Sequence, residues 1–263
     1  MKSRNYFADK VVVITGASSG IGKELALSFS ILGSKLVLAA RNEEKLAEVK
    51  EEIEVLRNEV ITVKTDISVE QDVINLVNAT INRWGKIDIF ISNAGQYIQR
   101  PIKNIVIEEF RESLEVNFFG SLYATKQILP IMAKQKSGHI VFVNSLDAKK
   151  GIVGDAPYVA AKSALDGFAD VLRQEVKKLG IAVTSVYPGR VDTPMIQDIE
   201  VPRISAKISA KKVSYAIIGG IYKNKPIIIV PKMSYLLGAL NNLSPRLMDW
   251  IYKVFRLEGR KIK

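Results

Sequence analysis

Apolar runs of strand length alternate with longer amphipathic segments along most of this chain. Residues 43–57 and 69–84, which lie between such runs, have apolar residues at helical spacing and many charges on one side. Parallel strands need a crossover segment between them, so this alternation predicts an α/β fold, a doubly wound parallel sheet with helices on both faces. With no linker or repeat in the 263 residues, we expect one domain spanning 1–263. We predict seven strands, at residues 11–14, 35–40, 60–65, 87–91, 139–144, 181–186 and 227–230.

A glycine-rich turn follows the first apolar run and precedes a helical pattern over residues 23–32. Glycines let a backbone turn sharply and bring bare N–H groups close to a pyrophosphate, while the positive end of the next helix favours the anion. The spacing Gly16-x3-Gly20-x-Gly22 departs slightly from the dinucleotide pattern G-x-G-x-x-G. This position in the chain favours a nucleotide site that includes Gly16, Ser18, Ser19, Gly20, Ile21 and Gly22.

The same turn also fits the G-x-S-x-G nucleophile elbow of α/β-hydrolases, with Ser18 as the nucleophile. A hydrolase triad needs a histidine, and the chain has only His139, which comes just before an apolar run. That position lies at the amino end of a strand, whereas sites on such sheets gather at the carboxyl ends. We therefore reject the hydrolase hypothesis and expect His139 to be structural.

Composition excludes other chemistries. The chain has no cysteine and one histidine, so disulfides, thiolate catalysis and a zinc site are not expected. The first ten residues have no apolar segment of signal-peptide length, and no apolar stretch approaches the roughly 20 residues of a transmembrane helix. We expect a cytoplasmic protein without a bound metal.

Positive charge is concentrated at the carboxyl end of the chain. Residues 201–263 contain 13 Lys and Arg but only two acidic residues, Asp249 and Glu258, so they carry the whole formal excess of +11. Within a basic segment at 233–263, residues 245–256 predict an amphipathic helix, which could lie on an anionic membrane, pack on its own domain or contact a neighbouring subunit. An anionic acyl carrier is another partner that this charge would suit. Aromatic residues do not alternate with the basic ones, so no specific nucleic-acid binding is expected.

Tyr158 and Lys162 are four residues apart in a helix-forming stretch, so they share one helix face. A phenol ionises near pH ~10, and an adjacent ammonium group would lower the pKa of Tyr158 toward working pH. Tyr158 could then act as a general acid or base. Ser145 follows a strand run and is expected at the carboxyl edge of the sheet, and Asn117 lies in a helical context that asparagine disfavours.

Several motifs occur together in one order: Thr15-Gly16-x3-Gly20-x-Gly22, Asn93-Ala94-Gly95, Asn117, Ser145, Tyr158-x3-Lys162 and Pro188-Gly189 through Thr193. In these motifs the chain resembles the short-chain dehydrogenase/reductase family over residues 8–195. The resemblance implies a Rossmann fold and hydride transfer between NAD(P)(H) and a carbonyl compound or secondary alcohol. It implies that Lys162 also holds the nicotinamide ribose, that Ser145 hydrogen-bonds the substrate oxygen and that Asn117 orders a water in a proton relay.

The resemblance also implies contacts to the rest of the cofactor and to partners. Asp66 and Ile67 are implied at the adenine, and Asn93, Ala94, Gly95, Pro188, Gly189, Val191 and Thr193 along the cofactor, the last two at the nicotinamide carboxamide. Residues 194–212 are implied to form a substrate lid, and helices beginning near Ile105 and Pro157 to form a homodimer or homotetramer. The basic tail suggests a lipophilic or 3-oxoacyl substrate. The alternative from another class is a catalytically silent dinucleotide-binding sensor or scaffold.

The end of the second predicted strand bears on the choice of cofactor. NAD enzymes often place a carboxylate there, about twenty residues after the glycine turn, to bind the ribose 2′-hydroxyl. Residues 39–42 contain no carboxylate, and Arg41 offers a guanidinium that suits a 2′-phosphate. We therefore predict a preference for NADP(H). If Arg41 instead pairs with Glu44 on the following helix, NAD(H) is equally acceptable.

Overall fold

The computed structural model describes most of the chain, and the residues described are 2–56, 58–200, 206–234, 240–241, 243–255, 257 and 260–261. Residues 235–239, 242, 256, 258–259 and 262–263 of the predicted basic segment lie outside this set, and so do residues 201–205 of the predicted lid.

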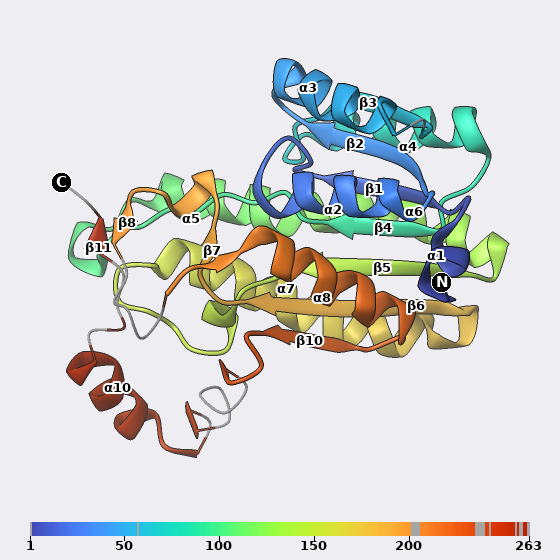
Figure 1. Ribbon diagram of the computed structural model, residues 1–263. Helices are drawn as coiled ribbons and strands as arrows, with labels where there is room; N and C mark the ends of the chain where they lie inside the picture. The colour runs from blue at the N-terminus through green and yellow to red at the C-terminus, as the bar shows by residue number, and fades with distance from the viewer. Residues whose placement is uncertain are drawn as a thin grey trace.

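A seven-stranded parallel sheet forms the centre of the fold, with strand order β10-β6-β5-β4-β1-β2-β3 (Figure 1). The predicted strands are confirmed, with small shifts: the fourth begins at Ile89 and the sixth continues to Pro188. The strands are β1 Val11–Thr15, β2 Lys35–Ala40, β3 Val60–Lys64, β4 Ile89–Ser92, β5 Gly138–Val143, β6 Ile181–Pro188 and β10 Ile227–Val230.

Helices cover both faces of the sheet, as the alternation predicts. In Figure 1, α2 and α8 lie in front of the strands. They pack with α3 over one buried core cluster, while α4, α6 and α7 pack over a second cluster on the opposite face. The helices are α1 Lys2–Phe7, α2 Gly20–Ile31, α3 Glu43–Glu54, α4 Glu70–Trp84, α5 Ile107–Leu114, α6 Gly120–Gln135, α7 Ala156–Glu175, α8 Ala210–Tyr222 and α10 Pro245–Val254.

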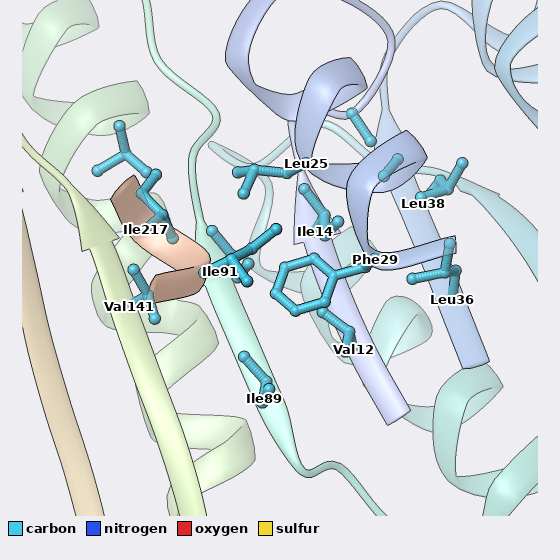
Figure 2. Close-up of a cluster of buried hydrophobic side chains, with 14 of the residues drawn as sticks. Val12, Ile14, Leu25, Phe29, Leu36, Leu38, Ile89, Ile91, Val141 and Ile217 are labelled. Atoms are coloured by element: carbon cyan, nitrogen blue, oxygen red, sulfur yellow. The ribbon is translucent and has the colours of Figure 1, made fainter. Parts of the chain in front are cut away.

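Strand β1 shows why its residues Val11 to Ile14 are all apolar. Val12 and Ile14 contribute to the cluster under α2, where Phe29 lies over them (Figure 2). Val13, between them, belongs to the cluster on the opposite face. Successive side chains of a strand point to opposite faces, so a strand covered on both sides must be apolar throughout.

The order of the strands places the functional crevice. From β1 the chain moves outward through β2 and β3, then returns to β4 on the other side of β1 and continues through β5, β6 and β10. Ligands of doubly wound sheets bind outside the carboxyl ends of the strands where the direction reverses. In this fold the reversal lies between β1 and β4.

The region after β6 is built from short elements. Strand β7, Val191–Asp192, pairs with β9, Ile208–Ser209, and β8, Ile199–Glu200, pairs with β11, Arg260–Lys261. Residues 210–212, the end of the predicted lid, form the first turn of α8. Within the described residues, no helix has both the length and the apolar character that a membrane span requires.

His139 lies in β5, at the amino end of the sheet, where it is buried. Its Nε2 is 2.7 Å from the Thr184 hydroxyl, which donates to the Lys225 carbonyl oxygen at 2.7 Å. This position confirms the structural role expected from the sequence.

Replacement of His139 should change how stability depends on pH. Burial lowers the pKa of His139 from 6.5 to about 4. Between these two pH values the unfolded chain binds more protons than the folded one, so the free energy of unfolding decreases as the pH is lowered. Relative to His139→Gln, the wild-type free energy of unfolding should fall by about 3 kcal/mol from pH 7 to pH 4. Urea unfolding of both proteins across this range measures the difference, in which titrations common to both cancel. A difference that stays constant with pH would contradict the prediction.

Candidate active site

A cavity of about 860 Å³ lies at the carboxyl ends of the central strands. The residues that the sequence proposed for the site come from eight separate stretches of chain, and every one of them except Gly22 lines this cavity. The structure therefore brings the predicted site residues together. It also adds residues from α10 and from the β7–β8 region.

Glycines allow three loops to approach one another at the nucleotide end of the cavity. Gly16 and Gly20 have φ values of +65° and +53°, which favour glycine. A Cβ on Gly16 would lie 2.9 Å from the Ala94 Cα, and one on Gly20 would lie 2.8 Å from the Thr193 Cγ2. The turn therefore contacts the loops after β4 and β6, and α2 begins directly after it.

Gly22 does not line the cavity but allows α2 to pack closely against the glycine turn. Its Cβ position would be 2.1 Å from the Gly16 carbonyl oxygen, so only glycine lets α2 start this close to the turn. The loop after β4 is fixed to the same turn, since the backbone N–H groups of Asn93 and Ala94 each donate to the Thr15 hydroxyl at 3.0 Å.

The Arg41 end of the cavity has the charges of a phosphate site. Arg41 and Lys45 line it, Arg41 is exposed, and among the described residues no ion pair holds Arg41. The alternative, a pairing of Arg41 with Glu44, is not seen in the part of the chain that the structure describes. Asp66 also lines the cavity, and its carboxylate accepts from the N–H and the hydroxyl of Ser68, at 3.0 and 2.6 Å, in a turn before α4.

Helix α7 carries Tyr158 and Lys162 on its buried face. The Lys162 ammonium donates to the Val143 carbonyl oxygen at 3.0 Å and lies 5.7 Å from the centre of the Tyr158 ring. Burial lowers the pKa of Lys162 from 10.5 to about 8, and the negative charge of Asp147 limits the shift. Lys162 can therefore exchange a proton near neutral pH.

The expected direction of the Tyr158 pKa is wrong. Burial, reinforced by the negative charge of Asp147, raises the pKa of Tyr158 well above 10, and a hydrogen bond with Ser145 only partly opposes this. The sequence argument considered the neighbouring ammonium group but could not include the loss of solvent around the phenol. Tyr158 is accordingly a neutral phenol that keeps its proton, the form needed in a general acid.

Asn117 lies in a π-helical turn, Glu115–Phe119, between α5 and α6. Its amide donates to the carbonyl oxygens of Ser113 and Gln96, at 3.0 and 2.9 Å, and its oxygen accepts from the Gln96 N–H at 3.2 Å. Such turns interrupt the helical hydrogen bonds and are frequent at functional sites. A Cβ on Gly95 would lie 2.9 Å from the Asn117 oxygen and 3.6 Å from the Lys162 ammonium, so both side chains adjoin Gly95.

Ser145 and its neighbour follow β5 at the cavity. The Ser145 hydroxyl accepts from the Asp147 N–H at 3.1 Å, and the Asn144 oxygen accepts from the Ser145 N–H at 2.9 Å. The Asn144 amide nitrogen is buried and has no hydrogen-bond partner in the described structure, although Asn144 lines the cavity. A buried donor without a partner is costly, which fits a cavity that receives a polar ligand.

A group of polar residues beside Tyr158 was missed by sequence reasoning. Tyr97 donates to Asp155 at 2.6 Å and lies edge-on against Tyr158, with ring centres 5.2 Å apart. Asp147 lines the same cavity, and its burial, with the charge of Asp155, raises its pKa from 3.8 to about 6. Asp147 could have been found, since it comes two residues after Ser145 at the end of a predicted strand.

Helix α10 supplies part of the apolar wall of the cavity, through Ile251, Tyr252 and Phe255. Leu257, which follows the helix, joins this wall, as do Met195 and Ile196 of the predicted lid. The amphipathic pattern of residues 245–256 puts Leu247, Trp250, Ile251, Val254 and Phe255 on one apolar face. In the structure Ile251 and Phe255 line the cavity, although Phe255 is 47% exposed, while Leu247, Trp250 and Val254 are exposed and do not line it.

Comparisons with known proteins give a consistent result. The family model of short chain dehydrogenases matches residues 10–203. An uncharacterized oxidoreductase of Staphylococcus epidermidis is 34% identical over 212 residues, which cover 80% of this chain and 91% of the relative. An actinorhodin polyketide ketoreductase solved with NADPH is 28% identical, with a TM-score of 0.77 over 84% of this chain and 95% of its own. A short chain dehydrogenase/reductase from Burkholderia phymatum in complex with NAD is 24% identical, with a TM-score of 0.84 over 92% and 95% of the two chains, and shows the shared fold.

Proposed function

Because the chain belongs to the short-chain dehydrogenase/reductase family, we propose that it reduces a carbonyl compound, or oxidises the matching secondary alcohol, with NADP(H) as the preferred cofactor. Membership of this family makes the protein an oxidoreductase that depends on a nicotinamide dinucleotide. The observation that carries the finer proposal is a buried, neutral Tyr158 beside Lys162 in the cavity at the strand reversal.

The residues present fit the dinucleotide. The glycine turn at the start of α2 offers backbone N–H groups and a helix N-terminus to a pyrophosphate. Asn144 offers a buried donor without a partner, and the loops at Asn93–Gly95 and Pro188–Thr193 line the cavity between the two ends. When bound, the nicotinamide supplies the hydride in reduction or accepts it in oxidation.

Proton transfer is the task of the protein's own side chains. In reduction, the Tyr158 hydroxyl gives its proton to the carbonyl oxygen, which the Ser145 hydroxyl holds by a hydrogen bond. Lys162 then restores the proton on Tyr158, because a pKa of about 8 lets it donate near neutral pH. Asn117, which adjoins Gly95 as Lys162 does, is proposed to position a water from which Lys162 recovers its proton.

Arg41 is proposed to set the preference for NADP(H). It is exposed at the cavity edge beside Lys45, with no carboxylate at the end of β2. Arg41→Asp should therefore raise the KM for NADPH at least about tenfold, because one charge-assisted contact is lost and the new carboxylate repels a 2′-phosphate. The same substitution should lower the KM for NADH. Initial rates with both nucleotides measure this. An exposed cation away from the cavity, Lys134, supplies the control Lys134→Asp, and an unchanged NADPH-to-NADH ratio in Arg41→Asp would refute the assignment.

The apolar wall supports a lipophilic substrate. Met195, Ile196, Ile251 and Phe255 line the part of the cavity contributed by the region after β6 and by α10. Residues 194–209 are proposed as the substrate lid, with the three residues after them assigned to α8. A 3-oxoacyl thioester on an acyl carrier is the second substrate class, since the basic residues of 201–263 would attract an anionic carrier.

A homodimer or homotetramer is proposed through α5 and α7. The segment that leads into α5 exposes Ile102, Ile105 and Ile107, and α7 exposes Val171. Exposed apolar residues gathered on one side of a molecule are typical of an interface. Light scattering of the purified protein would give the number of chains.

The function is tested with the purified protein and both reduced nucleotides against a panel of small diketones, 3-oxoacyl thioesters and a long-chain keto lipid. Oxidation of NADPH with any member supports the proposal, and the preferred class identifies the substrate type. Tight binding of NADPH without turnover of any member would favour a dinucleotide-binding sensor or scaffold.

A further inference from the structure

Helix α10 carries an exposed apolar stripe whose residues do not line the cavity. The stripe consists of Leu247, Trp250 and Val254, whose spacings of three and four residues align them along one side of the helix, together with Leu243, which precedes the helix. Their exposed fractions are 46%, 59%, 51% and 83%. In Figure 1, α10 stands apart from the sheet and its covering helices, on the same side of the molecule as β8 and β11. We call these four residues the outer stripe.

Positive charge lies directly beside the outer stripe. Arg246 and Lys253 are exposed, and each precedes a stripe residue by one position, so they flank it along the same edge of the helix. Asp249, the acidic residue of the helix, is paired with Lys150. Its charge is therefore neutralised, and the surface around the stripe is apolar and cationic.

Other apolar residues of the same helix are buried or line the cavity. Met248 is fully buried, and Ile251 and Tyr252 reach the cavity wall. The apolar residues of α10 thus include some that are buried or line the cavity and others, those of the outer stripe, that are exposed and do not line it. Exposed aliphatic residues with an exposed tryptophan and flanking bases are the composition of helices that lie in the interface of an anionic bilayer.

We propose that the outer stripe docks α10 onto an anionic membrane surface, with Leu247, Trp250 and Val254 inserted at the headgroup level and Arg246 and Lys253 against the lipid phosphates. The docked helix would place the cavity wall next to the bilayer. Delivery of a lipophilic substrate by this route rests on the proposed function, but the docking does not.

A second copy of the chain suits this surface less well. A stable protein interface buries about 800 Å² on each partner, more than one ten-residue helix offers on one side. A twofold contact through the stripe would also bring Arg246 and Lys253 of both copies together. Lipid phosphates, in contrast, neutralise these cations.

Vesicle flotation tests the docking. The wild-type protein should float with vesicles that contain phosphatidylserine and phosphatidylcholine, and much less with phosphatidylcholine alone. Arg246→Glu/Lys253→Glu should weaken binding to the anionic vesicles at least about tenfold, since each basic residue near an anionic surface contributes strongly to binding. Trp250→Ser should weaken it on both kinds of vesicle.

Matched controls separate the stripe from general charge and hydrophobicity. Lys177→Glu/Lys178→Glu makes the same change in net charge at exposed sites beyond α7, and Val55→Ser removes another exposed apolar side chain. Both should float like wild type. Equal losses in the controls and the α10 variants, or no flotation of wild type, would overturn the proposal.

Two further measurements are needed. One distinguishes a second copy of the chain from a membrane as the occupant of the stripe, and the other separates the docking from the proposed function. Self-association that disappears in Trp250→Ser, measured by sedimentation without lipid, would assign the stripe to a second copy and overturn membrane docking. The variants Arg246→Glu/Lys253→Glu and Trp250→Ser should keep wild-type turnover of a small soluble diketone, because none of these side chains lines the cavity. If all proteins lack turnover while flotation follows the pattern above, the proposed function fails and the docking stands.

Discussion

Tyr158→Phe should lower kcat for carbonyl reduction at least about 10²-fold and leave the affinity for NADPH within about twofold of wild type. The phenylalanine keeps the ring that packs edge-on against Tyr97 and removes only the hydroxyl that holds the transferable proton. The neighbouring phenol of Tyr97 donates its proton to Asp155 at 2.6 Å, so it is not placed to replace the missing donor. Steady-state rates with the best member of the substrate panel, and fluorescence titration with NADPH, measure the two quantities.

Tyr187→Phe is the matched control for this experiment. Tyr187 is also buried, its pKa is also raised mainly by burial, and its hydroxyl is held by Asp166, but it does not line the cavity. Its loss should cost stability without a comparable loss of kcat. If Tyr158→Phe keeps full activity, or if both variants lose it equally, Tyr158 is not the general acid.

Gly22→Ala should impair both folding and nucleotide binding. A Cβ at this position would lie 2.1 Å from the Gly16 carbonyl oxygen, and that atom belongs to backbone that can yield only if the whole turn moves. Overpacking of this kind costs about 1–3 kcal/mol of stability. Displacement of the turn should also weaken NADPH binding at least about tenfold, because the N–H groups that face the pyrophosphate move with it. Urea unfolding and NADPH titration measure the two effects.

The same substitution elsewhere should have the opposite sign. Gly219 lies within α8, and a Cβ there would meet no atom within 4 Å. Gly219→Ala should therefore stabilise the protein by up to about 1 kcal/mol through helix propensity and leave NADPH binding unchanged. Stabilisation of both variants would show that the close contact at Gly22 does not constrain the turn.

Most of the sheet could be predicted because its signal is local. Runs such as residues 11–14 and 36–40 are apolar at every position, which is what burial on both faces requires. The boundaries were less certain, since Ile87 precedes β4 and Pro188 extends β6. Strand ends depend on which neighbour continues to offer hydrogen bonds, and that neighbour is distant in sequence.

The membership of the candidate site could be predicted for a related reason. Ser145, Asn93 and Gly16 each follow a strand that the sequence identifies, and the carboxyl ends of parallel strands meet at one edge. Tyr158 and Lys162 are related by one helical turn. Local rules therefore placed residues from separate stretches in one cavity. The chemical roles of these residues remain predictions.

The electrostatics of that cavity could not be predicted in the same way. The sequence showed an ammonium group beside a phenol and gave a lowered pKa for Tyr158, whereas burial in the folded chain raises it. Asp155, Tyr97 and Tyr252 also escaped notice, because each reaches the cavity through packing that no local pattern records.

The sequence by itself determined the parallel sheet, the glycine turn and the shared helix face of Tyr158 and Lys162, because each follows from the conformational preferences and burial of neighbouring residues. Only the tertiary structure decided that Tyr158 keeps its proton and that α10 divides its apolar residues between the cavity and the surface. Both depend on which groups displace water from a side chain, and those groups come from parts of the chain that meet only when it folds.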